Sequence, residues 1–371
     1  MKKLFLLIII ILLSVYIVAC TAMGTNPDGI YLDNIHKSEQ FNTSLKKFQN
    51  PEATPLLTGK RSYFDVLSDF FFKGENRRPS EKLPEDASSL EALASKANNI
   101  RFIWFGHSTI LLEMDKKRIL IDPVFSKYAS PIPGIVKRFQ PPVYDVKNIH
   151  DVDVVLISHD HNDHLDYETI KKLKKRNLKF IVPLGVGAHL RYWGVDEKKI
   201  TELDWWENVS IQGLIFTAAP AQHFAGRGLF NENSTLWASW VVQGKERNIY
   251  FGGDSGYSKH YKEIGDRLGP FDLTFLENGA YDLSWKFVHQ LPEEGVQANI
   301  DLRGKAMVPI HWGMFDLALH SWHEPVERVT KEAEIKGVKI IAPKLGQLVS
   351  IQSEYKQETW WDSLIKAGNR K

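Results

Sequence analysis

The sequence has little of several features that define other classes of protein. It has one cysteine among 371 residues, Cys20, so a disulfide bond within the chain is excluded. Its 25 glycines, 17 prolines and 43% hydrophobic residues match neither a collagen-like, a disordered nor a coiled-coil chain. No repeat with the period of a solenoid or a propeller is present. These absences leave a globular protein, with enough residues for one large domain or two small ones.

An excess of charge of one sign is also missing. The chain has 47 basic and 45 acidic residues, for a formal net charge of +2. Removal of Lys2 and Lys3 with the leader described below would leave 45 basic residues, which equals the acidic count. A nucleic-acid-binding protein normally carries a basic surface. We therefore expect no nucleic-acid partner, and the sequence leaves a homo-oligomer open.

One long apolar run is present, at the start of the chain. Lys2 and Lys3 precede it, and Ile17-Val18-Ala19-Cys20 ends it, which is the layout of a secretory signal. Its end resembles a bacterial lipobox, which implies cleavage before Cys20 and acylation of that cysteine. A membrane-spanning anchor is the alternative, but the run is shorter than the roughly 20 residues that span a bilayer. We expect residues 1–19 to be a lipoprotein signal peptide and the protein to be exported and lipid-anchored to a bacterial cell membrane. Thr21 favours the outer membrane where one exists.

Composition divides the remaining chain into three parts. Residues 20–98 are polar and rich in loops, and form an N-terminal extension and linker; their strongest element is an aromatic helix at 63–72, ended by Gly74. We expect this helix to pack on the main domain, with contact to the bilayer as the alternative. Residues 77–96 are predicted to be a linker or surface excursion. Residues 99–355 form the main domain, and 356–371 a C-terminal tail.

Short β-branched runs alternate with helical stretches in the main domain. Twelve runs are predicted strands: 100–104, 109–113, 118–121, 153–157, 180–183, 214–218, 237–242, 248–251, 273–276, 306–308, 339–341 and 347–351. Helices are predicted at 167–176, 259–268, 292–302 and 324–336. Many strands with a few helices on the outer faces predict a layered α/β sandwich.

The strongest chemical signal is the segment Ser158-His159-Asp160-His161-Asn162-Asp163-His164. It follows an apolar strand, and the alternation of a strand end directs His159 and His161 to the same side. Asp163 and His164 then face a second point nearby. Imidazole and carboxylate are ligands for divalent cations such as zinc, so this segment predicts a metal site.

Three further candidate ligands each follow a predicted strand. They are His223, Asp254 and His311. Because α/β sheets commonly bind ligands beyond the carboxyl ends of their strands, these side chains are expected to join the histidine segment. The order along the chain is therefore HxHxDH, followed by His, Asp and His.

This arrangement resembles the metallo-β-lactamase fold hydrolases, and within them the N-acyl-phosphatidylethanolamine-hydrolysing phospholipase D family. The narrower resemblance rests on Gly106-His107-Ser108-Thr109, Ile121-Asp122-Pro123, Asp204-Trp205-Trp206-Glu207, Leu236-Trp237-Ala238-Ser239-Trp240, Gly253-Asp254-Ser255-Gly256-Tyr257 and Ile310-His311-Trp312-Gly313. The resemblance implies a four-layer αβ/βα sandwich. It also implies two divalent metal ions, with zinc the expected metal: one held by His159, His161 and His223, the other by Asp163, His164 and His311. Asp254 would bridge the two, and Asp163 and Asp254 would thus serve catalysis.

Other candidate site residues are less specific. Asp122 either orients a ligand histidine or is a turn aspartate before Pro123. His289 matches a family histidine that faces the substrate phosphate, but Val288 and Leu291 stand where the family has glutamine and aspartate. His107 and Arg227 are further candidates, with packing as their default role. Six histidines are interpreted as structural or exposed: His36, His150, His189, His260, His320 and His323.

The resemblance implies hydrolysis of N-acyl-phosphatidylethanolamine or a related phospholipid to phosphatidic acid and N-acylethanolamine. Two adjacent cations activate a shared water and stabilise charge at phosphorus, so no side-chain nucleophile is needed and Ser255 is not expected to be one. Hydrolysis of a lactone, amide or β-lactam on the same site is the alternative. A non-catalytic lipoprotein with a structural metal is disfavoured, because structural zinc normally takes four ligands and seven are present.

Overall fold

A computed structural model describes residues 5, 18–59, 61–93, 95–228 and 231–368. Most of the predicted signal peptide, residues 1–19, therefore lies outside the described residues. Residues 18–23 are helical, and Cys20 is half-buried. None of the helices in the described ranges is both long and apolar enough to cross a bilayer.

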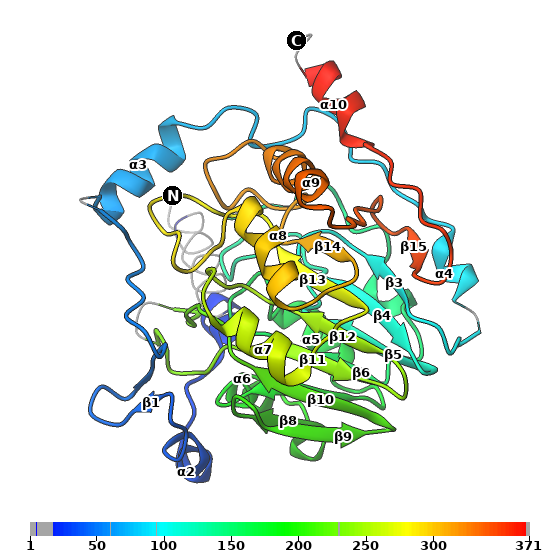
Figure 1. Ribbon diagram of the computed structural model, residues 1–371. Coiled ribbons are helices and arrows are strands. Elements are labelled where there is room, and N and C mark those ends of the chain that lie inside the picture. Colours follow the sequence, from blue (N-terminus) through cyan, green and yellow to red (C-terminus); the bar gives the residue numbers. More distant parts are fainter. Residues whose placement is uncertain (1–4, 6–17, 60, 94, 229–230, 369–371) are drawn as a thin grey trace.

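Two β-sheets lie face to face in the centre of the molecule (Figure 1). The first has the order β15-β3-β4-β5-β6-β7-β8 and the second β14-β13-β12-β11-β10-β9. The first sheet consists of β3 Arg101–Trp104, β4 Ile110–Met114, β5 Lys117–Ile121, β6 Val154–Leu156, β7 Lys179–Pro183, β8 Ile200–Leu203 and β15 Leu348–Ser350. The second consists of β9 Asn208–Ile211, β10 Leu214–Ala219, β11 Ser239–Gln243, β12 Asn248–Phe251, β13 Leu273–Glu277 and β14 Met307–Ile310.

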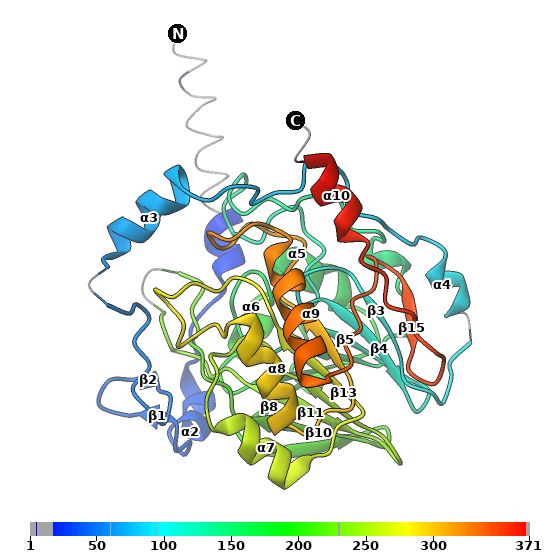
Figure 2. The ribbon, with the colours of Figure 1, turned by 45° about the horizontal axis from the view of Figure 1, so that its top comes forward.

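Helices cover the outer face of each sheet. Helices α5 Tyr167–Leu173 and α6 Gly187–Tyr192 lie on the first sheet, and α7 His260–Leu268, α8 Pro292–Asp301 and α9 Glu324–Lys336 lie on the second (Figures 1 and 2). The remaining short elements are η1 Gly29–Tyr31, α2 Leu32–Ile35, β1 Phe41–Asn42, β2 Lys47–Phe48, α3 Tyr63–Phe72, α4 Ser89–Ala92, η2 Val146–Asn148, η3 Glu197–Lys199 and α10 Trp361–Gly368. The predicted four-layer αβ/βα sandwich is confirmed.

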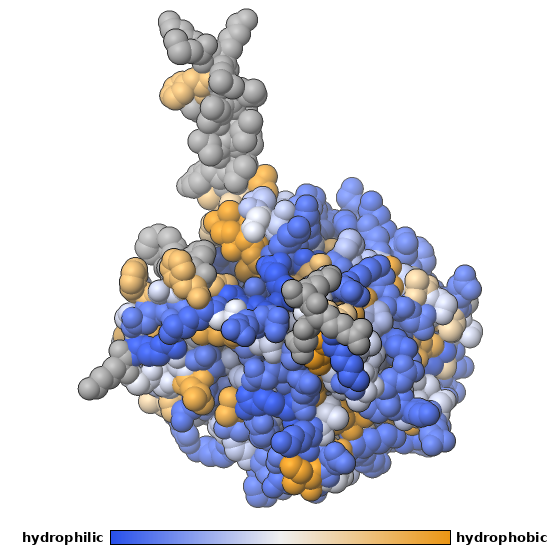
Figure 3. Space-filling model, turned by 90° about the horizontal axis from the view of Figure 1, so that it is seen from above, coloured by the Kyte–Doolittle hydropathy of each residue, from blue (hydrophilic) through white to orange (hydrophobic). Residues whose placement is uncertain are grey.

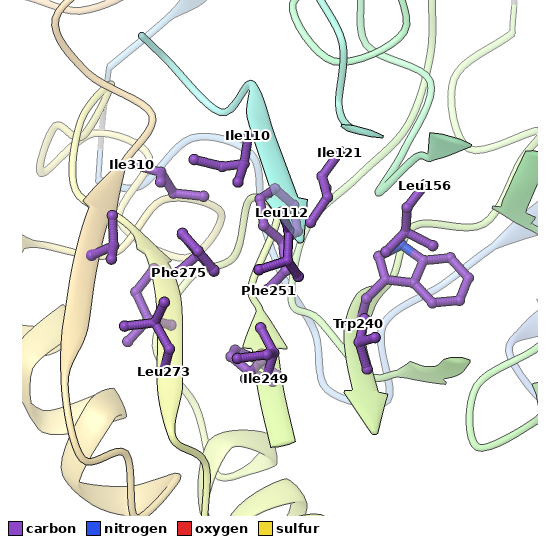
Figure 4. Packing of buried hydrophobic residues seen from close by; sticks show 14 of the residues in the cluster. Ile110, Leu112, Ile121, Leu156, Trp240, Ile249, Phe251, Leu273, Phe275 and Ile310 are labelled. Atoms are coloured by element: carbon purple, nitrogen blue, oxygen red, sulfur yellow. The ribbon is translucent and has the colours of Figure 1, made fainter. Parts of the chain in front are cut away.

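Alternation along the strands explains the layers. In β3 and just after it, Phe102 and Trp104 point into the core between the sheets, whereas Ile103 and Phe105 point into the core under α5 and α6. Figure 4 shows the inner packing, with residues of β4 and β5 facing Phe251 and Phe275 of the second sheet. The rings of Phe102 and Phe275 meet edge to face, with centroids 5.2 Å apart.

Each sheet is antiparallel in one half and parallel in the other. The parallel strands are β5 to β8 in the first sheet and β12 to β14 in the second. Because the carboxyl ends of parallel strands share one edge, residues that directly follow β5, β6, β12, β13 and β14 can converge. This topology positions the site.

Some predicted elements differ from the structure. Residues 339–341 are not a strand, because Ile340 forms only an isolated bridge with Met307. Strand β11 begins at Ser239 rather than 237, because Trp237 lies in the preceding loop and donates its indole N–H to Ala221 O. Strands β8 and β9 carry mostly half-exposed side chains, so they lack the apolar runs on which the prediction depended.

The segments outside the main domain pack against it. Leu83 and Leu93, in the predicted linker 77–96, are buried, and Glu85 bridges to Leu345. Helix α3 has the predicted bounds, and a capping box between Ser62 and Asp65 starts it. The C-terminal tail forms α10.

Candidate metal centre and active site

Four candidate ligands form one group at the edge of the two sheets. His159 and His161 follow β6, His223 follows β10, and Asp254 follows β12. His161 Nδ1 lies 2.8 Å from His159 Nε2 and 3.3 Å from His223 Nε2. Asp254 Oδ2 lies 3.7 Å from His223 Nε2. Three imidazole nitrogens and a carboxylate oxygen from three separate strand ends thus surround one point.

A second group lies beside the first and shares Asp254. Asp254 Oδ2 is 3.0 Å from His311 Nε2 and 3.2 Å from His164 Nε2. Asp163 Oδ2 is 3.5 Å and 3.6 Å from the same two nitrogens. The structure therefore brings together all seven residues predicted as metal ligands, with Asp254 between the two groups.

The contacts of the second ring nitrogens fit metal binding. His164 Nδ1 contacts Asp122 at 2.8 Å, and His223 Nδ1 contacts Val288 O at 2.9 Å. These partners hold each ring with its other nitrogen facing the centre, as the outer contacts of metal-binding histidines do. Asp254 Oδ1 is buried and has no hydrogen-bond partner among the described residues, and the buried His164 Nε2 and His311 Nε2 lie 3.2 and 3.0 Å from Asp254 Oδ2 without the geometry of a hydrogen bond. Buried polar atoms without partners are costly, so these atoms suit cations.

Electrostatics point the same way. Burial alone would lower the pKa of His311, but Asp254 and Asp163 raise it to about 10. The pKa of His164 is likewise raised against burial, mainly by the same two carboxylates. By contrast, burial holds the pKa of His159 and His223 well below the usual value, so both rings are neutral and each has a nitrogen lone pair available to a metal ion. The two carboxylates thus attract positive charge to a place where neutral imidazoles are also available.

Asp122 lies behind the metal groups and does not face the cavity. Its carboxylate accepts the Ser158 backbone N–H and hydroxyl at 2.7 and 2.6 Å, besides contacting His164. It is also a turn residue after β5, with a φ of 40°. Asp122 therefore has the position expected from both interpretations of the sequence, because it occupies a turn and also contacts the candidate ligand His164. His107 and His311 also have left-handed backbone, with φ values of 54° and 65°.

Two further residues complete the surroundings of the metal groups. His289 Nδ1 lies 2.9 Å from Glu277 Oε2, and the His289 ring stacks on His311. Glu277 is buried, ends β13, and also accepts the Ser255 and Gln290 backbone N–H groups. Glu277 is not among the site residues predicted from the sequence. Its position at the end of β13, which runs parallel to β12 and β14, was the signal that could have identified it.

His107 and Arg227 have different positions. His107 Nε2 lies 3.0 Å from Asp163 Oδ2, so it supports a candidate ligand. Arg227 is buried behind the metal groups, where it contacts backbone carbonyls of the histidine segment. Ser255 is fully buried, and its hydroxyl donates to Gly256 O. A buried, engaged hydroxyl is not placed as a nucleophile.

A cavity of about 420 Å³ opens above the metal groups. Its floor contains His161, Asp163, Asp254, His289 and His311. Its walls are largely apolar, and they come from the N-terminal extension, the loop before α8 and other loops: Leu56, Leu57, Val66, Phe70, Phe224, Ala280, Trp285, Val288 and Leu317. A substrate in this cavity would meet polar groups at one end and apolar side chains around the rest.

Comparisons with known proteins agree with this geometry. Residues 117–312 match the family described as Beta-lactamase superfamily domain. An uncharacterized protein of Mycobacterium tuberculosis is 44% identical over 76% of this chain and 77% of its own. The N-acyl-phosphatidylethanolamine-hydrolyzing phospholipase D 1 of Caenorhabditis elegans is 29% identical over 82% of this chain and 92% of its own. Igni18, a metallo hydrolase of Ignicoccus hospitalis, shares the fold, with a TM-score of 0.53 and 20% identity over 70% of this chain and 100% of its own.

The chain belongs to the beta-lactamase superfamily. Its His and Asp clusters and its relatives make it a metal-dependent hydrolase. The predicted resemblance to the N-acyl-phosphatidylethanolamine-hydrolysing phospholipase D family is confirmed by relatives that carry this description.

Proposed function

We propose that this protein is a phospholipase D-type phosphodiesterase that holds two divalent metal ions, with zinc as the expected metal. Its substrate would be N-acyl-phosphatidylethanolamine or a related phospholipid, and its products phosphatidic acid and N-acylethanolamine. The relatives described as hydrolysing this lipid support the reaction. The observation that carries the proposal is the apolar cavity whose polar floor is the pair of His and Asp groups.

The cavity suits an amphiphile. N-acyl-phosphatidylethanolamine has a charged phosphodiester between two apolar parts, its glycerol-linked acyl chains and its N-acyl chain. Apolar walls such as Phe70 and Trp285 would accept an acyl chain, because burial of apolar surface stabilises binding by about 25 cal/mol per Å². The phosphodiester would then lie at the floor beside Asp163 and Asp254.

Two cations held there would lower the pKa of a bound water and neutralise charge on the phosphoryl oxygens. The chain's own residues fix the geometry. His107 and Asp122 hold Asp163 and His164, and Val288 O holds His223. Glu277 accepts the His289 Nδ1–H, so His289 Nε2 would donate a hydrogen bond to a phosphoryl oxygen only in the doubly protonated form of the ring.

We further propose a lipid anchor at Cys20, with the protein exported and tethered to a bacterial membrane. A tether would raise the local concentration of a bilayer substrate. Most of the face in Figure 3 is hydrophilic, with apolar residues in a few patches. On α3, which lines the cavity, Phe64 and Phe72 are exposed. Cys20→Ser should abolish palmitate labelling and membrane fractionation, whereas Cys20→Ser protein that still labels and fractionates with membranes would contradict the anchor.

A lipid-class activity screen tests the substrate. Purified protein with its native metal is incubated with N-acyl-phosphatidylethanolamine, ordinary phosphatidylethanolamine, a lactone and a β-lactam, and products are identified by mass spectrometry. Formation of phosphatidic acid and N-acylethanolamine supports the proposal. Ordinary phosphatidylethanolamine is included because Val288 and Leu291 replace polar residues of the family, which would widen the range of head groups that the site accepts. Turnover of lactones or β-lactams alone contradicts it and favours a carbonyl hydrolase on the same metal groups.

A further inference from the structure

The first described residues after Cys20 are docked on the main domain. Trp193 Nε1 donates to Thr21 O at 2.8 Å, and Arg227 Nη2 donates to Ala22 O at 2.8 Å. Thr25 N donates to His189 Nδ1 at 3.1 Å. Ala22 is buried, and Figure 2 shows this part of the chain as the blue helical ribbon against the body of the molecule, below the grey trace. Residues 21–25, here called the docked segment, are thus held by three separate side chains.

Arg227 connects the docked segment to the histidine segment. Its Nη1 donates to Asp160 O at 2.5 Å and to Leu165 O at 2.7 Å. These two carbonyls flank His161, Asp163 and His164. Burial lowers the pKa of Arg227 to about 10, which leaves the guanidinium charged at neutral pH. One rigid, charged fork therefore joins Asp160 and Leu165, which bracket three candidate ligands, to Ala22.

Asp160 and His189 form a second connection. Strand-like alternation directs the Asp160 side chain away from the metal groups, opposite to His159 and His161. Asp160 Oδ1 accepts the Gly226 N–H at 2.7 Å, and Oδ2 contacts Thr235 Oγ1 at 2.9 Å and His189 Nε2 at 3.2 Å. His189 Nδ1 accepts the Thr25 N–H, so its proton is on Nε2 and is donated to Asp160.

We infer that Arg227 and the docked segment are positioning groups for the metal centre: the segment behind Cys20 stabilises the back of the loop whose front carries His159, His161, Asp163 and His164. No atom of this network belongs to a candidate metal ligand side chain. Its effect is to restrict the backbone of the loop, because a ligand set that is already ordered binds a cation with less loss of conformational entropy. Loosening the docked segment should therefore speed the release of metal.

Gly24 offers a test that leaves the metal ligands, Arg227 and Asp160 unchanged. It has a φ of 75°, and a Cβ there would lie 2.2 Å from His189 Nδ1. Gly24→Ala should displace the docked segment from His189. Gly29→Ala is the matched control, because Gly29 has a φ of 55° but its Cβ would meet nothing within 4 Å. Both substitutions introduce a similar backbone strain, and only the first breaks the docking.

The full-length chain is purified in detergent with its metal, and metal release to a chromophoric chelator is followed in time. Gly24→Ala should release metal about 10-fold faster, the lower end of the usual effect of outer contacts on a metal site. Hydrogen exchange should rise in residues 159–165 as well as 21–25. Gly29→Ala should match the wild type in both measurements.

Arg227 supplies the second variant. Arg227→Met should increase metal release more than Gly24→Ala, and Arg227→Lys should lie between Arg227→Met and the wild type, since an ammonium cannot reach all three carbonyls as a fork does. The melting temperature of the metal-free protein distinguishes a positioning role from general destabilisation, because a positioning role predicts faster metal release without a matching fall in that temperature. If Arg227→Met does not fold, Gly24→Ala decides. Metal release at the wild-type rate in Gly24→Ala, or equal acceleration by Gly29→Ala, would overturn the inference.

Discussion

The floor and the walls of the cavity are built from different parts of the chain. The floor consists of His and Asp side chains that follow strands of both sheets, together with His289. Much of the wall consists of side chains from the N-terminal extension, including Leu56 and Val66, and from the loop around Trp285. The central sandwich thus provides the polar groups, and peripheral segments provide the apolar surface.

This difference separates two properties of the protein. The floor is fixed by sheet topology, so changes there should remove metal and activity for every substrate. The wall residues that the extension supplies are not candidate ligands, so changes to these side chains should alter which substrates are preferred. Fold alone does not choose the substrate, and here the choice is expected to depend on the extension.

The largest effect is expected from Asp254→Asn in the floor. Asp254 contacts candidate ligands of both groups, so metal content should fall at both positions and activity by at least about 100-fold, the upper range for site contacts. Elemental analysis of protein purified without chelator should give close to two ions per wild-type chain on the two-metal proposal. Asp272→Asn, a pairing partner of Lys305 away from the site, is the control. Full activity in Asp254→Asn would show that Asp254 does not bridge.

A smaller effect is expected from Glu277→Gln, beneath the floor. Glu277 accepts a hydrogen bond from His289 and is not among the seven predicted ligands. Its loss should lower kcat by about 10-fold through misorientation of His289, with metal content unchanged. Steady-state kinetics and elemental analysis on the same preparation check this result. A loss of metal with no separate loss of kcat would instead assign Glu277 to the metal centre, as its distance to His311 allows.

The wall is tested by Phe70→Ala. Phe70 lines the cavity from α3, so its truncation should lower kcat/KM by several-fold for substrates with long acyl chains, because each CH₂ group that is no longer buried costs ~0.8 kcal/mol. Short-chain, monomeric diesters should be nearly unaffected. Phe72→Ala on the same helix is the control, because Phe72 is 86% exposed and does not line the cavity. An equal loss for short and long chains would remove the distinction between floor and wall.

The last effect concerns protons at the floor. In metal-free protein the pKa of His311 is raised to about 10, so His311 is protonated at neutral pH and must lose its proton when metal binds. Metal affinity should therefore rise with pH up to about 10. The same shift stabilises metal-free protein fully below pH 6.5, and this stability is lost as pH rises towards 10. Calorimetry in buffers of different ionisation enthalpy measures the protons released, and a proton-independent affinity would contradict the assignment.

The sequence predicted the floor much better than the walls. His159, His161 and Asp163 were recognisable because metal-binding residue types cluster after an apolar strand, and His223 and His311 because they follow strands too. Glu277 was missed because one carboxylate after a strand is a weak signal by itself. Edge strands β8 and β9 were missed because their side chains are half-exposed and show little apolar periodicity.

The contacts of the N-terminal segments could not be predicted in the same way. Thr21 and Ala22 are held through their backbone carbonyls, and a carbonyl is present at every residue whatever its side chain. Helix α3 was located from its apolar pattern, but its position beside the metal groups depends on tertiary packing between segments far apart in the chain. Periodicity identifies elements, and it does not identify which long-range partner an element meets.

The most direct test of the central claim is the fate of oxygen from labelled water during turnover of N-acyl-phosphatidylethanolamine. A phosphodiesterase acting at the floor of the cavity places the labelled oxygen on the phosphate of phosphatidic acid, and His311→Ala should suppress this product far more than it changes binding to lipid vesicles. Mass spectrometry of the two products locates the label. Label in a released fatty acid, with none on phosphorus, would contradict the account.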